Sequence, residues 1–261
     1  MVRVDFSANA RAYDDRHGAF VDDDLARRLI DAAALPSGAR VLDVGAGTGR
    51  VAIPLASRGC RVVALDPSTP MLARTLDKAP GVRLALTVGA GAPLPFRDRS
   101  FDGVVIARLL YLLSDWRETL DEAVRVLRGG GCLLHEWGNG DPDEEWVQMR
   151  EKVRALFENA GVASPFHPGA RDESQIDLWL RDRGMSRAGE VRAPSAMRTT
   201  MGKFLERVER SECTYTWSVP EDVQRACLPA LRAWAAERFD LEREVPAPRE
   251  TKWTVFRKRA P

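Results

Sequence analysis

A glycine-rich turn after a short apolar run constrains this chain of 261 residues more than any other stretch. The run Val41-Leu42-Asp43-Val44 is followed by Gly45-Ala46-Gly47-Thr48-Gly49-Arg50, a pattern typical of a buried parallel strand that enters a loop before a helix. Its three glycines lack Cβ atoms, so the backbone can adopt positive φ and approach a ligand closely. The turn therefore predicts a ligand site at the carboxyl end of a strand.

An acidic residue ends the next apolar run. Asp66 follows Val62-Val63-Ala64-Leu65 and lies seventeen residues after Gly49. A carboxylate at this point can accept hydrogen bonds from both hydroxyls of a ribose, as it does in dinucleotide-binding folds. The ligand is therefore expected to contain a ribose.

Two departures separate this turn from the dinucleotide fingerprint. The third glycine of that fingerprint would fall at position 50, where this chain has Arg50, and Asp43 precedes the first glycine by two residues. The charge of Asp43 would repel a pyrophosphate but attract the ammonium group of an amino acid. A nicotinamide-dependent oxidoreductase is therefore the weaker alternative.

Four sequence blocks resemble the class I methyltransferases that use S-adenosylmethionine, within their small single-domain bacterial subgroup. The blocks are Val41–Arg50, Val63–Ser68 with Met71-Leu72, Leu94–Phe96 leading to Ser100–Asp102, and Glu122–Gly130. The resemblance implies an α/β fold with a Rossmann-like, doubly wound, seven-stranded and mostly parallel sheet, its last strand antiparallel and helices on both faces. It also implies S-adenosyl-L-methionine as the cofactor and S-adenosyl-L-homocysteine as the product.

The same resemblance implies which residues contact the cofactor. They lie in the glycine turn, after the second strand, after the third strand and at the end of the fourth: Asp43, Gly45, Ala46, Gly47, Gly49, Asp66, Pro67, Met71, Gly91, Ala92, Ala107 and Arg108. Tyr13 is a further candidate, with packing between helices as its alternative. Met71 has a place in the core as its alternative, and Arg108 can either hold an acidic substrate or pair with a surface carboxylate.

Adenine recognition departs from the family pattern. The family usually has an acidic residue near the turn after the third strand, but the segment Gly89-Ala90-Gly91-Ala92-Pro93 has only small residues. Backbone groups around Ala90 to Ala92, or a water molecule, are therefore expected to contact the adenine.

His135 is the first candidate for a general base and Tyr111 the second. His135 lies in an expected fifth strand, Cys132–Trp137, where alternation places it on one face with Trp137 while Glu136 takes the other. An imidazole can accept a proton near neutral pH, although a hydrogen-bonded structural histidine is the alternative. Methyl transfer is expected to be an in-line displacement that depends mainly on alignment, so a thiol or amine acceptor would need no base.

The second half of the chain predicts a helical insertion. Residues 1–35 are expected to form a helical cover over the cofactor, and residues 36–137 with 251–258 the cofactor-binding core, whose sixth strand lies near 185–192. Residues 138–184 and 193–250 are expected to form a helical substrate cap with four tryptophans that could contact an apolar or planar acceptor: Trp146, Trp179, Trp217 and Trp234.

Composition favours a small-molecule methyl acceptor. The formal net charge of +1 argues against nucleic acid or an anionic membrane as a partner, and no apolar run has the length of a membrane span or the features of a signal peptide. The four cysteines show no metal-binding spacing, which predicts a cytoplasmic protein with reduced thiols and no metal. A non-catalytic cofactor-binding sensor or partner subunit is the main alternative. The acceptor, its attacking atom and the oligomeric state have no signature in the sequence.

Overall fold

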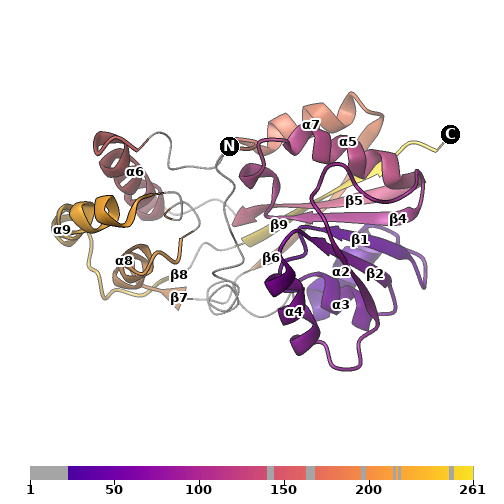
Figure 1. Ribbon diagram of the computed structural model, residues 1–261, viewed down its shortest axis with the longest axis horizontal. Coiled ribbons are helices and arrows are strands. Elements are labelled where there is room, and N and C mark those ends of the chain that lie inside the picture. Colours follow the sequence, from indigo (N-terminus) through magenta and orange to yellow (C-terminus); the bar gives the residue numbers. More distant parts are fainter. Residues whose placement is uncertain are drawn as a thin grey trace. The chain divides into compact units, whose positions relative to one another are not determined.

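A computed structural model describes residues 23–139, 144–162, 168–194, 198–213, 216, 219–246 and 250–260. Its main feature is a seven-stranded sheet in the order β3-β2-β1-β4-β5-β9-β6 (Figure 1). The strands are β1 (Arg40–Val44), β2 (Arg61–Asp66), β3 (Leu84–Val88), β4 (Phe101–Ala107), β5 (Leu127–Asn139), β6 (Met185–Pro194) and β9 (Glu250–Lys258).

The first five strands are parallel, and β9 runs against its neighbours. The register aligns Asp43 with Ala64 of β2 and with Val105 of β4, and Ala107 with Glu136 of β5. At the other end of the sheet, Lys258 Nζ donates to the carbonyl of Leu127 at 2.8 Å. The amide of Arg259 donates to the carbonyl of Gly184 at 3.2 Å. The end of β9 therefore lies beside the starts of β5 and β6, which confirms the predicted mostly parallel sheet with an antiparallel last strand.

Helices cover both faces of this sheet. One apolar core joins the sheet to α2 (Asp23–Ala32), α3 (Ala52–Ser57) and α4 (Thr69–Lys78), and includes Leu29, Leu55 and Leu72. The other joins it to α5 (Trp116–Val126) and α7 (Glu173–Arg181), and includes Leu120 and Ile176. The strands are rich in apolar residues on both faces because each face is buried.

The helix after the glycine turn has a proline near its start. Helix α3 begins at Ala52, and Pro54 is its third residue. Pro54 therefore lies in the first helical turn, where a backbone N–H has no partner within the helix and its loss costs little.

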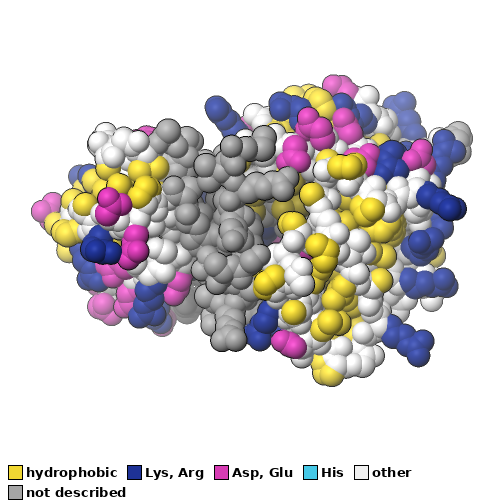
Figure 2. All heavy atoms as spheres, viewed as in Figure 1, with side chains coloured by type: hydrophobic (Ala, Val, Ile, Leu, Met, Phe, Trp, Pro, Cys, Tyr) yellow, Lys and Arg dark blue, Asp and Glu magenta, His cyan; other side chains and the backbone are white. Residues whose placement is uncertain are grey.

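A second compact unit is helical. It contains α6 (Glu144–Asn159), α8 (Met201–Glu209), α9 (Glu221–Arg238) and the short pair β7 (Arg198–Thr199) and β8 (Val245–Pro246). Its own apolar core includes Trp146, Phe157 and Phe204, with Trp146 and Phe204 in edge-to-face contact at 5.1 Å. On its visible face, positively and negatively charged side chains are interspersed (Figure 2).

The helix α7 groups with the sheet, although the sequence analysis assigned residues 138–184 to the helical insertion. Residues 168–193 belong to the same compact unit as the sheet. Ile176 and Leu180 are buried in the core that contains α5, and Trp179 Nε1 donates to Asp121 of α5 at 2.8 Å. Packing against α5 therefore places α7 in the compact unit that contains the sheet.

Across the described ranges, the helices are too short or too polar to cross a membrane.

Candidate functional site

The glycine turn between β1 and α3 has a backbone that other residues would not adopt easily. Gly45 and Gly49 have φ values of 72° and 80°. A Cβ on Gly45 would lie 2.7 Å from Leu109 Cδ2, and one on Gly49 would lie 2.6 Å from Thr75 Cγ2. Both positions therefore require glycine for conformational and steric reasons.

Asp66 connects the turn to the end of β2. Its Oδ2 accepts a hydrogen bond from the amide of Gly47, and its Oδ1 accepts one from the amide of Ser68, both at 2.8 Å. Burial raises the pKa of Asp66, while the two amides act in the opposite direction. The predicted ribose-binding carboxylate therefore lies directly against the glycine turn.

Pro67 and Ser68 connect Asp66 to α4. Pro67 follows Asp66, and Ser68 caps the helix by accepting from the amide of Met71 at 3.4 Å. The side chain of Met71 is buried. The contact of Met71 with the cofactor stays a prediction.

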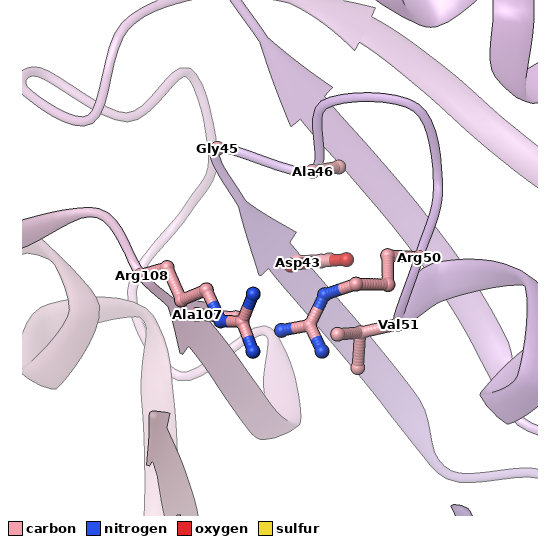
Figure 3. Close-up of a pocket in the computed structure, with 7 residues that line it drawn as sticks. All are labelled: Asp43, Gly45, Ala46, Arg50, Val51, Ala107 and Arg108. Carbon is pink, nitrogen blue, oxygen red and sulfur yellow. The ribbon is translucent and has the colours of Figure 1, made fainter. Parts of the chain in front are cut away.

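Asp43 is a buried carboxylate that lines a narrow pocket. The pocket is lined by Asp43, Gly45, Ala46, Arg50, Val51, Ala107 and Arg108, and has a volume of about 20 Å³, room for about one water molecule (Figure 3). Among the described residues, Oδ1 of Asp43 has no hydrogen-bond partner. Burial raises the pKa of Asp43 to about 7, although the charge of Arg50 opposes this shift.

Two arginines and one glutamate form an ion-paired cluster beside this pocket. Arg50 and Arg108 extend toward each other in Figure 3, and each binds one carboxylate oxygen of Glu136. The Glu136 side chain is 0% exposed, and those of Arg50 and Arg108 are 14% and 13% exposed. Arg108 therefore pairs with a carboxylate, but with a fully buried one rather than with a surface residue.

Arg50 and Glu136 were not predicted as site residues. Strand alternation carries the signal that could have found Glu136, because it lies on the face opposite His135 and pairs with Ala107 of the pocket. For Arg50, the available signal was its position directly after the glycine turn. Neither signal reveals that the two side chains meet.

His135 lies in the protein interior. Its side chain is buried, and Nε2 has no hydrogen-bond partner among the described residues. Burial lowers the pKa of His135 to about 3, and the charge of Lys252 acts in the same direction. The imidazole is therefore neutral at pH 7 and a weak proton acceptor, which does not support the predicted role as a general base.

Tyr111 lies in the short 3-10 helix η1 (Leu110–Leu112) after β4. Its ring contacts that of Trp137 edge to face at 5.8 Å, and the Trp137 ring is 6.3 Å from that of His135. The two predicted catalytic candidates are thus joined through Trp137. Because His135 and Glu136 are adjacent strand residues, this aromatic group and the arginine cluster begin from opposite faces of β5.

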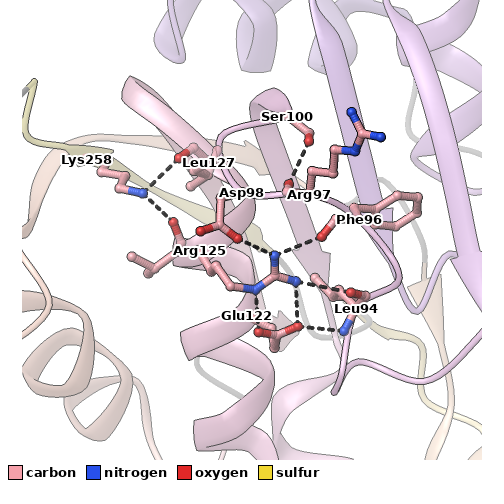
Figure 4. A network of polar contacts seen from close by, with 10 residues as sticks. Leu94, Phe96, Arg97, Asp98, Ser100, Glu122, Arg125, Leu127 and Lys258 are labelled. Atoms are coloured by element: carbon pink, nitrogen blue, oxygen red, sulfur yellow. Dashed lines mark hydrogen bonds and ion pairs between the residues drawn. The ribbon is translucent and has the colours of Figure 1, made fainter.

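The loop after β3 packs closely against α5. A Cβ on Gly91 would lie 2.7 Å from Thr119 of α5, so this position has no room for a side chain. The following residues are held by α5 as well: the amide of Leu94 donates to Glu122 at 2.7 Å, and Arg125 donates to the carbonyl of Phe96 at 2.8 Å (Figure 4). Adenine contacts from Gly91 and Ala92 stay a prediction.

Some predicted residues lie outside the described ranges, namely Tyr13 and Trp217. Within those ranges, no group of three His, Cys, Asp or Glu side chains could hold a metal ion. Cys60, Cys132, Cys213 and Cys227 are not joined in disulfides.

Comparisons with known proteins agree with this geometry. Residues 42–135 match the family described as "Methyltransferase domain". An uncharacterised methyltransferase of Mycobacterium tuberculosis is 31% identical over 192 residues, which cover 69% of this chain and 76% of that protein. A demethylmenaquinone methyltransferase of Beutenbergia cavernae is 42% identical over 108 residues, or 41% of this chain and 44% of that protein. Among solved structures, a putative methyltransferase of Bacillus halodurans has a TM-score of 0.64 at 20% identity, covering 90% of this chain and 99% of that one.

Proposed function

The chain belongs to the class I methyltransferases that use S-adenosylmethionine, and from this membership we propose that it methylates an oxygen, nitrogen or other nucleophilic atom of a small molecule. The observation that carries the proposal is the pocket beside the glycine turn, where a buried carboxylate oxygen of Asp43 has no partner among the described residues. A buried polar atom of this kind is costly unless a ligand pairs with it.

The residues present fit the cofactor. Gly45 and Gly49 let the turn pack tightly, because a Cβ at these positions would meet Leu109 and Thr75. We assign the ribose hydroxyls to Asp66 and the ammonium group to Asp43. When bound, the cofactor supplies a methyl group on a sulfonium, which is already activated for transfer.

The protein's own contribution is to align the acceptor and exclude water. Such positioning can account for a large part of the rate enhancement when the leaving group needs no activation. Burial lowers the pKa of His135 to about 3, so we expect the acceptor to react without a proton transfer to that imidazole. Both Arg108 and Tyr111 follow the carboxyl end of β4. We retain Tyr111 as a residue that contacts the acceptor.

A small-molecule acceptor is favoured by charge. The net charge of +1 and the interspersed charges on the visible face of the helical unit do not resemble a surface for a polyanion (Figure 2). The similar demethylmenaquinone methyltransferase carries a name that indicates a small-molecule acceptor, although the similarity covers less than half of each chain. The expected substrate cap, residues 138–184 and 193–250, stays a proposal.

Calorimetry tests this function. S-adenosylmethionine and S-adenosylhomocysteine are expected to bind the wild type with micromolar affinity, whereas NADH should not bind. Asp66→Ala should lose most of this affinity, and Asp77→Ala serves as a control because its carboxylate is exposed on α4. Pools of small acceptors are then screened for S-adenosylhomocysteine formation. Binding of NADH, or of none of the three compounds, would contradict the proposal.

A further inference from the structure

We propose that Gly169 is a positioning residue for methyl transfer, which holds η1 in place through its backbone. Leu109, the residue before η1, is thereby kept beside the glycine turn, and Tyr111 within η1 is kept against Trp137. The segment before α7 is consequently coupled to the cofactor site. This inference rests on the proposed function, because it presumes a cofactor at the glycine turn and an acceptor beside Tyr111.

Two backbone hydrogen bonds join η1 to the segment before α7. The amide of Gly169 donates to the carbonyl of Tyr111 at 3.0 Å, and the amide of Ala170 donates to the carbonyl of Leu110 at 3.1 Å. A 3-10 turn of three residues can form few hydrogen bonds within itself. The conformation of η1 therefore depends on a segment that lies far along the chain.

The close approach of these two backbones requires a glycine at position 169. A Cβ on Gly169 would lie 2.0 Å from the carbonyl oxygen of Leu110 and 2.7 Å from that of Tyr111. Both are backbone atoms, which no side-chain rotation can move out of the way. Gly169 does not have a positive φ, so the requirement is for space rather than for conformational freedom. A larger residue would push η1 away from the segment before α7.

The segment before α7 is itself held firmly. Asp172 caps α7 by accepting from the amide of Gln175 at 3.0 Å, and Gln175 Oε1 accepts from the amide of Arg171 at 3.2 Å. Ala170 is buried in the apolar core that includes residues of α5 and α7. The support of η1 is therefore part of a packed helix, and such rigid support is what a precise site geometry needs.

On its other side, η1 reaches both halves of the proposed site. Leu109 fills the space beside the glycine turn, because a Cβ on Gly45 would lie 2.7 Å from Leu109 Cδ2. The Tyr111 ring contacts that of Trp137 edge to face at 5.8 Å. A displacement of η1 would therefore disturb the cofactor turn and the proposed acceptor contact together. Misplacement of reacting groups by about 1 Å can cost on the order of 100-fold in rate.

Hydrogen exchange in the wild type tests the coupling. The amides of Gly169 and Ala170 are followed by NMR with and without saturating S-adenosylhomocysteine, whose binding is first verified by calorimetry. We expect the ligand to slow their exchange at least about threefold, because opening of the tether would release Leu109 from the glycine turn and weaken binding. Amides of residues 185–188, at the start of β6, are the control and should be unaffected. Unchanged exchange at both tether amides would overturn the inference.

Two substitutions break the connection at different points. Gly169→Ala should weaken S-adenosylhomocysteine binding on the order of tenfold, because the displaced η1 carries Leu109 with it. Leu109→Ala leaves the tether intact but removes the side chain beside Gly45, so bound ligand should no longer slow exchange of the Gly169 amide. If Gly169→Ala fails to fold, exchange in the wild type and in Leu109→Ala decides the question.

Gly189→Ala is the matched control for Gly169→Ala. Gly189 lies in β6, it also lacks a positive φ, and a Cβ there meets nothing within 4 Å. The same substitution at this position should therefore leave the affinity for S-adenosylhomocysteine unchanged.

A fluorine label reports the environment of Tyr111. The chain has three tyrosines, so protein labelled with 3-fluorotyrosine should give three ¹⁹F signals, and Tyr111→Phe identifies one of them by its disappearance. Gly169→Ala should shift this signal, and S-adenosylhomocysteine should shift it in the wild type, whereas Gly189→Ala should not. If Gly169→Ala lowers only the melting temperature, with neither the signal nor the affinity changed, Gly169 serves packing alone and the positioning role is wrong.

The outcomes distinguish this inference from the proposed function. If the wild type does not bind S-adenosylhomocysteine, the proposed function fails and the inference fails with it. If the wild type binds the ligand but the tether amides and the Tyr111 signal do not respond, only the role of Gly169 is refuted.

Discussion

Arg108 is bound twice by Glu136: its backbone amide donates to the Glu136 carbonyl at 2.8 Å, and its side-chain Nε donates to the Glu136 carboxylate at 3.0 Å. The first bond sets the path of the chain as it leaves β4, and the second sets the direction of the guanidinium. One residue of β5 therefore controls both the backbone and the side chain of a pocket residue. This control explains how Arg108 is held at its unfavourable positive φ.

The first prediction concerns Asp43 and pH. Burial raises its pKa from the ordinary 3.8 to about 7, so between these values the folded protein keeps a proton that the unfolded chain releases. The free energy of unfolding should therefore fall as pH rises through this window and level off above pH 7. Without ligand, Asp43→Asn is expected to be more stable than the wild type at pH 8 by roughly 1–4 kcal/mol, and the gain should shrink toward pH 4. Urea unfolding of both proteins at several pH values measures this gain in the free energy of unfolding. A gain that does not change with pH would contradict the raised pKa of Asp43.

The second prediction concerns the glycine turn. Gly45→Ala should weaken S-adenosylhomocysteine binding by more than about tenfold and lower stability by roughly 1–3 kcal/mol, because the methyl group meets Leu109 at 2.7 Å. Gly59→Ala is the matched control, since its φ is 88° and a Cβ there meets nothing within 4 Å. This control should lose only the stability that its positive φ costs, and it should bind S-adenosylhomocysteine normally. Equal effects of the two substitutions would show that the contact with Leu109 is unimportant.

The third prediction concerns the loop that follows β3. Arg125 binds Glu122 of α5, Asp98 and the carbonyl groups of Leu94 and Phe96 (Figure 4). Arg125→Met should lower the free energy of unfolding by about 1–3 kcal/mol, because these backbone groups lose their partner. Arg128→Met removes a more exposed ion pair with Asp102 and should cost less than about 1 kcal/mol. Thermal unfolding compares them, and a larger loss for Arg128→Met would be the contrary result.

The fourth prediction concerns His135. Because its pKa is lowered to about 3, its imidazole signals in NMR spectra should not shift between pH 5 and 8. His135→Gln identifies those signals by their disappearance. Titration of the assigned imidazole near pH 6.5 would restore His135 as a candidate base.

The fifth prediction concerns thiol reactivity. Burial raises the pKa of Cys132 to about 11, and the same cause raises that of Cys227, which is only partly buried. In the native protein at pH 8, Cys132 should react with a disulfide reagent on the order of 100-fold more slowly than in urea. Cys227 should react sooner, and mass spectrometry of labelled peptides distinguishes the two. Labelling of Cys132 as fast as that of Cys227 would be inconsistent with its burial.

The local pattern determined the sheet and the position of the ligand site. Apolar runs ending in Gly45 and Asp66 predicted two neighbouring parallel strands, because strand ends in such sheets meet at one edge. The structure confirms this arrangement, with Asp66 bonded to the amide of Gly47. These features follow from short stretches of chain, so periodicity and turn residues were enough to predict them.

Only the tertiary structure decided what the charged residues do. Arg50 and Glu136 are 86 positions apart in the chain, and their pairing depends on strand order and on which face each side chain takes. The unfavourable environment of His135 and the packing of α7 on α5 are likewise consequences of burial by distant segments. The sequence by itself determined the strands, the glycine turn and the family. Tertiary structure decided the burial and partners of each ionisable group, because burial and charge pairing arise only when segments far apart in the chain pack together.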